Sequence, residues 1–335
     1  MKIAIHKSEG SFSDYWIDHC IQSKLPYKEV NCYDSDIIQQ IEDCDVLLWH
    51  HNHGNYKDTL FAKQLLFSLE QSGKKVFPDF NTGWHFDDKV GQKYLLESIG
   101  APLVPSYVFY DKKSALNWIR TTSFPKVFKL RGGAGSANVQ LIKTRKEAKQ
   151  IVNRAFGKGF SQFNGKRYFI EKFNRFRSGK EPLKKVFMAF GRMLISTEHA
   201  KIKGNEKGYA YFQDFIPNND SDIRIVVIGN KAIAVKRMVR KNDFRASGSG
   251  NFNFDANLFN KETLKIAFKI AEGINSQCCA MDFIYDANNA PLIVEISYGF
   301  MSKSWAPCPG YWDGNLNFHN GEVLPEKWIL QEAIK

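Results

Sequence analysis

Over the first 80 residues, short apolar runs alternate with amphipathic stretches. Residues 2–6 and 46–49 are apolar runs of strand length, whereas residues 57–71 carry apolar side chains at helical spacing. An order in which strands and helices alternate is typical of a small parallel sheet with helices on both faces. We therefore expect a doubly wound α/β domain over residues 1–80.

The rest of the chain mixes strands and helices in a different order, which is typical of an α+β arrangement. Residues 222–228 and 231–237 alternate apolar and polar positions around Gly229-Asn230, and this pattern predicts a hairpin. Residues 168–173 form a short apolar and aromatic run, which we interpret as another strand.

A second hairpin is predicted near the end of the chain. Residues 281–285 and 292–296 are apolar runs, and residues 286–291 between them are dense in turn formers. Each run contains one carboxylate, Asp282 or Glu295, whose burial without a partner would be costly. A bound Mg²⁺ would compensate both charges, because it takes carboxylates together with phosphate oxygens and water. Exposure of both carboxylates to solvent is the alternative, and the hairpin alone does not decide between them.

A glycine-rich loop follows the strand that ends in Lys129. Its glycines let backbone N–H groups approach phosphate oxygens closely, and the lysine adds a point charge for the same phosphates. The loop residues are Gly132, Gly133, Gly135 and Ser136. The GK[ST] sequence of a Walker A motif is missing, so an ordinary glycine-rich hairpin is the alternative.

Composition and charge narrow the class of protein. The 335 residues are 43% hydrophobic and 24% charged, with a formal net charge of +12. Basic chains bind nucleic acid or acidic surfaces, but no helix-turn-helix or finger pattern is present. A polyanionic small ligand such as ATP explains the clustered lysines and arginines equally well.

Six cysteines show no zinc-ligand spacing and are expected to be free thiols. No apolar run approaches membrane-spanning length, and the first residues do not resemble a signal peptide. We therefore expect a cytoplasmic protein with no membrane partner.

Several of these signals, taken in order, resemble the ATP-grasp superfamily. Lys89 opens a predicted helix, Lys129 precedes the glycine-rich loop, and residues 213–216 precede Asp222-Ile-Arg224. Arg237 ends the next strand, and the two carboxylate strands come last. The pattern looks most like the branch that contains glutathione synthetase, D-alanine–D-alanine ligase and the ligases that add glutamate to protein or cofactor termini. The resemblance covers residues 81–300.

The resemblance implies a two-lobed ATP-grasp domain after the N-terminal domain. The linker and first lobe would span residues 81–212, with a basic insertion near 173–209, and the second lobe residues 213–335. Lys89 and Lys129 are similar to two lysines that contact ATP phosphates, and residues 132–136 to the loop that closes over them. The segment similar to the adenine-binding segment is Gln213, Asp214, Phe215 and Ile216.

The resemblance also implies catalytic and metal-binding roles. Arg224 and Arg237 are similar to cations near the acyl phosphate and the γ-phosphate. Asp282, Glu295 and Ser297 stand at the positions of the Mg²⁺ ligands. The family motif is Glu-x-Asn, so Ser297 is a departure: a hydroxyl can ligate Mg²⁺ or hold a metal-bound water, but it lacks the amide carbonyl.

The activity implied is that of an ADP-forming carboxylate–amine ligase that uses ATP and Mg²⁺ and acts through an acyl phosphate. Its substrates would be a small-molecule or peptide carboxylate and an amine, and a homodimer is expected from the proteins it resembles. Two alternatives stay open: an ATP-binding protein without ligase turnover, and a basic nucleic-acid-binding protein.

Overall fold

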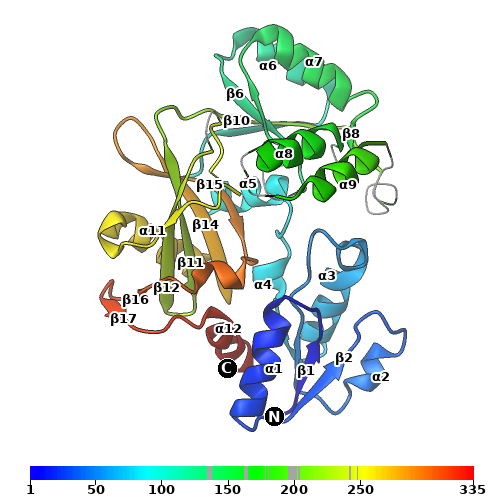
Figure 1. Ribbon diagram of the computed structural model, residues 1–335, viewed down its shortest axis with the longest axis vertical. Helices are drawn as coiled ribbons and strands as arrows, with labels where there is room; N and C mark the ends of the chain where they lie inside the picture. Colours follow the sequence, from blue (N-terminus) through cyan, green and yellow to red (C-terminus); the bar gives the residue numbers. More distant parts are fainter. Residues whose placement is uncertain are drawn as a thin grey trace. The chain divides into compact units, whose positions relative to one another are not determined.

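The computed structural model describes residues 1–133, 138–161, 165–177, 179, 181–194, 202, 204–240, 243–246 and 248–335. The chain forms two compact units (Figure 1). Unit 1 comprises residues 1–104 and 216–335, and unit 2 comprises residues 105–215. The units are defined by packing alone, so the functional division into residues 1–80, 81–212 and 213–335 stays a prediction.

The N-terminal part of unit 1 is a parallel sheet with helices on both faces, as predicted. Its strands are β1 (Ile3–His6), β2 (Tyr27–Val30), β3 (Val46–Leu48) and β4 (Lys75–Phe77), in the order β2-β1-β3-β4. One face packs on α1 (Phe12–Gln22) and α12 (Pro325–Ile334), and the other on α2 (Ile37–Gln40) and α3 (Tyr56–Gln71). Neighbouring side chains on a strand point to opposite faces. Ile3 and Ile5 therefore enter the core beneath α1 and α12, and Ala4 enters the core beneath α2 and α3.

A second sheet of unit 1 is antiparallel throughout. Its main strands are β11 (Ser221–Ile228), β12 (Lys231–Met238), β14 (Cys278–Tyr285) and β15 (Pro291–Ser297). The shorter ones are β13 (Phe252–Asn253), β16 (Gly310–Asp313) and β17 (Phe318–Asn320). The order is β15-β14-β11-β12-β16-β17, with β13 on β12. Both predicted hairpins are confirmed, and Gly229 supplies the positive φ of +54° that the β11–β12 turn uses.

The two faces of this sheet have different surroundings. One face packs on α11 (Lys261–Gly273) through residues such as Ile225 and Met281. The other face carries Val226 and Ala280, which join the core beneath α1 and α12. Short helices complete unit 1: α4 (Phe80–Gly83), α5 (Lys89–Ser98) and two 3₁₀ turns, Ala256–Leu258 and Ser302–Trp305.

Unit 2 is built on an antiparallel sheet of four strands in the order β5-β10-β6-β7. These are β5 (Ser106–Phe109), β6 (Lys126–Lys129), β7 (Gln140–Ile142) and β10 (Ala210–Asp214). The helices α6 (Lys112–Thr121) and α7 (Arg145–Ala155) pack on one face around Phe128 and Phe212. A small ribbon joins β8 (Phe160–Ser161) to β9 (Asn205–Glu206).

The strand predicted at residues 168–173 is wrong, because this segment lies within helix α8 (Gly165–Arg177). Helix α8 packs against α9 (Leu183–Leu194), and Figure 1 shows the two side by side. Phe169, Phe173 and Phe176 recur at i, i+4 and i+7, a helical period that the strand interpretation missed. None of the helices in the described ranges is both long and apolar enough to cross a membrane.

Candidate functional site

The antiparallel sheet of unit 1 gathers charged side chains at one end of one face. Cross-strand register places Asp222 opposite Arg237, Arg224 opposite Asp282, and Asp282 opposite Glu295. Asp222 and Arg224 are two residues apart on β11, so both point to the same face. Five charged residues from four strands therefore share one patch of the sheet: Asp222, Arg224, Arg237, Asp282 and Glu295.

Asp282 bridges two guanidinium groups. Arg224 holds it in a bidentate pair, with Nε–Oδ1 at 2.7 Å and Nη2–Oδ2 at 2.8 Å. Arg237 Nη2 lies 2.8 Å from Asp282 Oδ2 and also forms a bidentate pair with Asp222 at 2.6 and 2.7 Å. Such paired, charge-assisted hydrogen bonds fix the position of both guanidinium planes. Asp222 thereby orients the Arg237 guanidinium.

Glu295 is held by a lysine from a different element. Lys89 is the first residue of α5, whose N-terminus is capped by Asp88 through a 2.9 Å bond from the Gly91 N–H. Lys89 Nζ lies 3.0 Å from Glu295 Oε1, and their side chains are 6% and 33% exposed. The structure thus brings the predicted phosphate lysine to a predicted metal ligand.

The cluster contains equal numbers of formal charges of each sign. Its three cations are Lys89, Arg224 and Arg237, and its three carboxylates are Asp222, Asp282 and Glu295. Burial alone would raise the pKa of Asp282, but Arg224 and Arg237 together hold it well below its usual range. Burial lowers the pKa of Arg237 while Asp282 and Asp222 raise it, and the net direction is upward. Asp282 and Arg237 are therefore both ionised at neutral pH.

Two of the three predicted metal ligands fit Mg²⁺ in kind. Asp282 and Glu295 are cross-strand neighbours that offer carboxylate oxygens, the donors Mg²⁺ prefers. The Ser297 hydroxyl instead closes a local turn, donating to the Gly299 carbonyl at 3.2 Å and accepting from its N–H at 3.1 Å. Among the described residues, no three His, Cys, Asp or Glu side chains converge on one metal position. The role of Ser297 stays a prediction.

In unit 2, the predicted phosphate lysine and the predicted adenine segment meet on one face of the sheet. Lys129 Nζ donates to Gln213 Oε1 at 2.6 Å, and Gln213 Nε2 donates to Ser106 Oγ at 3.1 Å. Lys129 and Gln213 are 4% and 2% exposed, and they come from the neighbouring strands β6 and β10. This buried chain of hydrogen bonds fixes the lysine's direction.

Asp214 lies on the opposite face of the same sheet. Its Oδ1 is 2.5 Å from Nζ of Lys126, which is itself 5% exposed and lies near the rings of Tyr107 and Trp118. The sequence analysis did not single out Lys126; its position opposite Asp214 follows from the β6–β10 register. The side chains of Gln213 and Asp214 therefore point to opposite faces of the sheet.

The glycine-rich loop is described in part. Gly133 has a positive φ of +100°, and the Arg131 N–H at the start of the loop donates to Tyr209 Oη at 2.6 Å. Gly135 and Ser136 lie outside the described residues. Phe215 and Ile216 are half-buried and stand where unit 2 ends and the second part of unit 1 begins.

Two family models match the chain. A model of the RimK-like ATP-grasp domain matches residues 161–301, and a model of the carbamoyl-phosphate synthase L chain, ATP binding domain, matches residues 88–178. The second range contains Lys89 and Lys129, and the first contains both arginines and both carboxylate strands.

Solved structures share the fold at low identity. The biotin carboxylase domain of the 2-oxoglutarate carboxylase from Hydrogenobacter thermophilus, a dimer in complex with MgADP, ADP and bicarbonate, is 13% identical, with a TM-score of 0.60 over 99% of this chain and 69% of its own. A D-cycloserine synthetase is 12% identical, with a TM-score of 0.57 over 100% of this chain and 99% of its own.

One curated relative matches a shorter stretch. An uncharacterized protein of Mycoplasma genitalium is 23% identical over 120 residues, which are 34% of this chain. The match covers 42% of that relative, so the chain spans less than half its length.

Proposed function

Because the chain belongs to the ATP-grasp superfamily, we propose that it is an ATP-dependent, ADP-forming ligase that joins a carboxylate to an amine through an acyl phosphate. The observation that supports this most is the Asp282 carboxylate between Arg224 and Arg237, with Glu295 opposite it. Phosphoryl transfer to an anionic acceptor needs fixed cations beside oxygen ligands for Mg²⁺, and this cluster supplies both.

We assign the ATP phosphates to Lys129 and to backbone N–H groups of the loop that begins with Gly132 and Gly133. The hydrogen bond from Lys129 to Gln213 orients the ammonium group before any ligand binds. A cation that is already positioned stabilises the transferring phosphoryl group without paying for reorganisation during the reaction.

Arg224 and Arg237 are the proposed catalytic residues, because their guanidinium groups would stabilise charge that develops on the transferring phosphoryl oxygens. When bound, Mg²⁺ on Asp282 and Glu295 would add further neutralisation of the phosphates. The acyl phosphate is attacked by the amine of the second substrate, so this chain need not supply a nucleophile of its own.

The balance of charges in the cluster suggests how metal and nucleotide bind. A metal ion that entered alone would add positive charge to a largely buried cluster that is already compensated. A metal ion that enters with ATP brings the negative phosphates as well. We therefore propose that Mg²⁺ and nucleotide bind together, each weakly in the absence of the other.

Thermal unfolding with Mg²⁺ alone, ADP alone and both together tests the binding step. A ligand at a hundredfold excess over its dissociation constant stabilises the folded state by about 2.7 kcal/mol. We expect that scale of stabilisation only with both ligands, and its loss in Lys129→Ala. The matched control is Lys149→Ala, because Lys149 is an exposed lysine on α7. No stabilisation in the wild type would contradict the nucleotide site.

The ligase step is tested by ADP release in mixtures of candidate carboxylates and amines. Release should require both substrates and should fall by at least about a hundredfold in Glu295→Gln. Full turnover of the Glu295→Gln variant would show that the Glu295 carboxylate takes no part in the reaction.

A second candidate function is nucleotide binding without ligase turnover. The observation that favours it is the Ser297 hydroxyl, which closes a local turn with Gly299. This candidate predicts normal stabilisation by Mg²⁺ and ADP with no substrate-dependent ADP release. Ser297→Asn, which restores the family motif, would then raise turnover above background.

A further inference from the structure

We propose that α8 and α9 form a docking surface for an anionic lipid bilayer. The proposal does not depend on the ligase activity, because it rests on the exposed side chains and the charge of one segment of unit 2. A surface of this kind lies on the bilayer without spanning it, so it is compatible with the described helices, none of which is long and apolar enough to cross a membrane.

Helix α9 exposes large apolar side chains next to its buried positions. Val186 and Ala189 are buried. Leu183, Phe187 and Phe190 recur at i, i+4 and i+7 and are 48%, 69% and 48% exposed. An ordinary surface helix of a soluble protein has one apolar stripe, and that stripe is buried. In α9 the apolar stripe continues past its buried residues onto exposed side chains.

Helix α8 extends the same apolar surface. Ile170 and Phe173 are 56% and 42% exposed. Phe169 links the two helices, because its ring centroid lies 6.2 Å from that of Phe173 and 5.8 Å from that of Phe190. Contiguous exposed apolar surface of this kind marks an interaction site more often than isolated exposed residues do.

The charge of this segment indicates an anionic partner. Residues 161–209 contain twelve Lys or Arg against four Glu and no Asp, so they carry +8 of the chain's +12. Lys184 and Lys185 are exposed on α9 beside the apolar stripe. Nucleic acid would use the basic residues but leave Phe187 and Leu183 without a partner. A bilayer surface takes both, since phenyl and leucyl groups enter the acyl boundary while lysines contact anionic headgroups.

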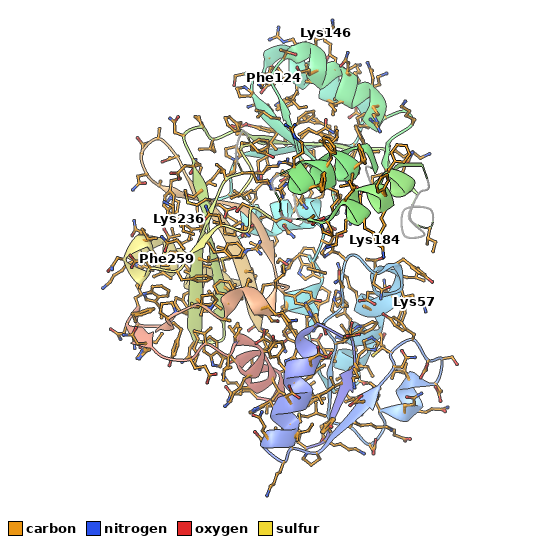
Figure 2. The ribbon with its side chains drawn as sticks, viewed as in Figure 1. Lys57, Phe124, Lys146, Lys184, Lys236 and Phe259 are labelled. Atoms are coloured by element: carbon orange, nitrogen blue, oxygen red, sulfur yellow. The ribbon has the colours of Figure 1, made fainter. Side chains whose placement is uncertain are left out.

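Helix α7 of the same unit provides the contrast. It is also basic, but Ala148, Val152 and Ala155 are buried and Ile151 is half-buried. None of the described apolar side chains of α7 is exposed beside the exposed lysines Lys146 and Lys149. Figure 2 labels Lys146 on α7 and Lys184 on α9, the two helices of this contrast.

Vesicle flotation of the full chain tests the proposal. The vesicles are phosphatidylcholine alone and phosphatidylcholine mixed with phosphatidylglycerol. We expect the wild type to float only with the anionic vesicles, and less so at high salt. Phe187→Ser and the pair Lys184→Glu/Lys185→Glu should each lower the bound fraction at least about tenfold. The matched control Lys146→Glu/Lys149→Glu has the same net charge as the α9 pair and should bind as the wild type does.

Three outcomes would overturn the proposal. The first is a wild type that floats with neither vesicle, and the second is Phe187→Ser binding as well as the wild type. The third is an equal loss of vesicle binding in Lys146→Glu/Lys149→Glu, which would mean that overall charge alone accounts for the binding. Retention of the protein on polyglutamate but not on vesicles would assign the surface to an acidic polypeptide instead. Each substituted side chain is exposed, so unchanged thermal unfolding confirms that the variants fold.

Discussion

Positive charge is handled in opposite ways in two regions of the molecule. In unit 1, three cations are largely buried and meet three carboxylates within 3.0 Å. In residues 161–209 of unit 2, basic residues outnumber acidic ones three to one, and Arg177, Lys184 and Lys185 of its helices are exposed. A buried cation requires a partner inside the fold, because its desolvation would otherwise be too costly. An exposed basic surface carries no such cost and can take its partner from outside the chain.

The largest effect on stability is expected from Asp282→Ala. The substitution removes the shared partner of Arg224 and Arg237 and leaves two guanidinium groups without it. Breaking a buried ion pair in this way costs about 3–5 kcal/mol. Urea unfolding monitored by circular dichroism measures the loss, and a cost below that of an ordinary surface substitution would show that the cluster reorganises freely.

A smaller loss is expected from Arg237→Lys. Lysine keeps the charge but cannot form the bidentate pair with Asp222 and reach Asp282 at once. Two charge-assisted hydrogen bonds are worth about 3 kcal/mol in total when lost, and the retained charge recovers part of that. The same unfolding measurement should rank this variant between Asp282→Ala and the wild type.

Acid should erase the difference between the wild type and Asp282→Ala. The folded pKa of Asp282 lies below the unfolded value, which is about 3.9. Its ionised form therefore stabilises the fold at every pH above that value, and this stabilisation is lost as the pH falls below it toward the folded pKa. Unfolding free energies of both proteins from pH 7 down to the limit of folding should converge only at the acid end. Convergence already near neutral pH would contradict the assigned direction.

The smallest effect on stability is expected from Lys89→Met. Glu295 is one third exposed, and such pairs contribute at most about 1 kcal/mol. Stabilisation by Mg²⁺ and ADP should fall much more than intrinsic stability does, since the family resemblance predicts that Lys89 contacts the ATP phosphates. A variant that keeps the full ligand effect would limit Lys89 to a structural role.

The sequence predicted the strands of the unit 1 site better than it predicted which side chains pair across them. The apolar runs around the turn formers at residues 286–291 and the Gly229-Asn230 turn predicted both hairpins. The pairing of Arg224 with Asp282 depends on the register between β11 and β14, strands that are more than fifty residues apart. No local pattern carries that information.

The strand expected at residues 168–173 is an error of interpretation with a simple physical cause. The run at residues 168–173 is apolar and aromatic enough for a strand, and its helical period becomes visible only when Phe176 is included. The adenine-binding segment over residues 213–216 stays a prediction, and within it Gln213 and Asp214 point to opposite faces, as consecutive residues of a strand do. Lys126 was overlooked because its partner is fixed by the neighbouring strand rather than by its own sequence.

The contact between α1 and α12 affects the order in which the chain can fold during synthesis. Trp16 Nε1 donates to the Glu326 backbone carbonyl at 3.0 Å, although the two residues are 310 positions apart in the chain. Ile329 and Leu330 of α12 are completely buried in the core that α1 and α12 form with the N-terminal sheet. A ribosome adds residues at about 5–20 per second, so roughly 15–60 seconds pass between the two helices. Unit 2 is one continuous segment and can fold as it emerges. Until α12 leaves the exit tunnel, the N-terminal sheet keeps the part of its apolar face that α12 covers exposed, and such transiently exposed surface favours aggregation.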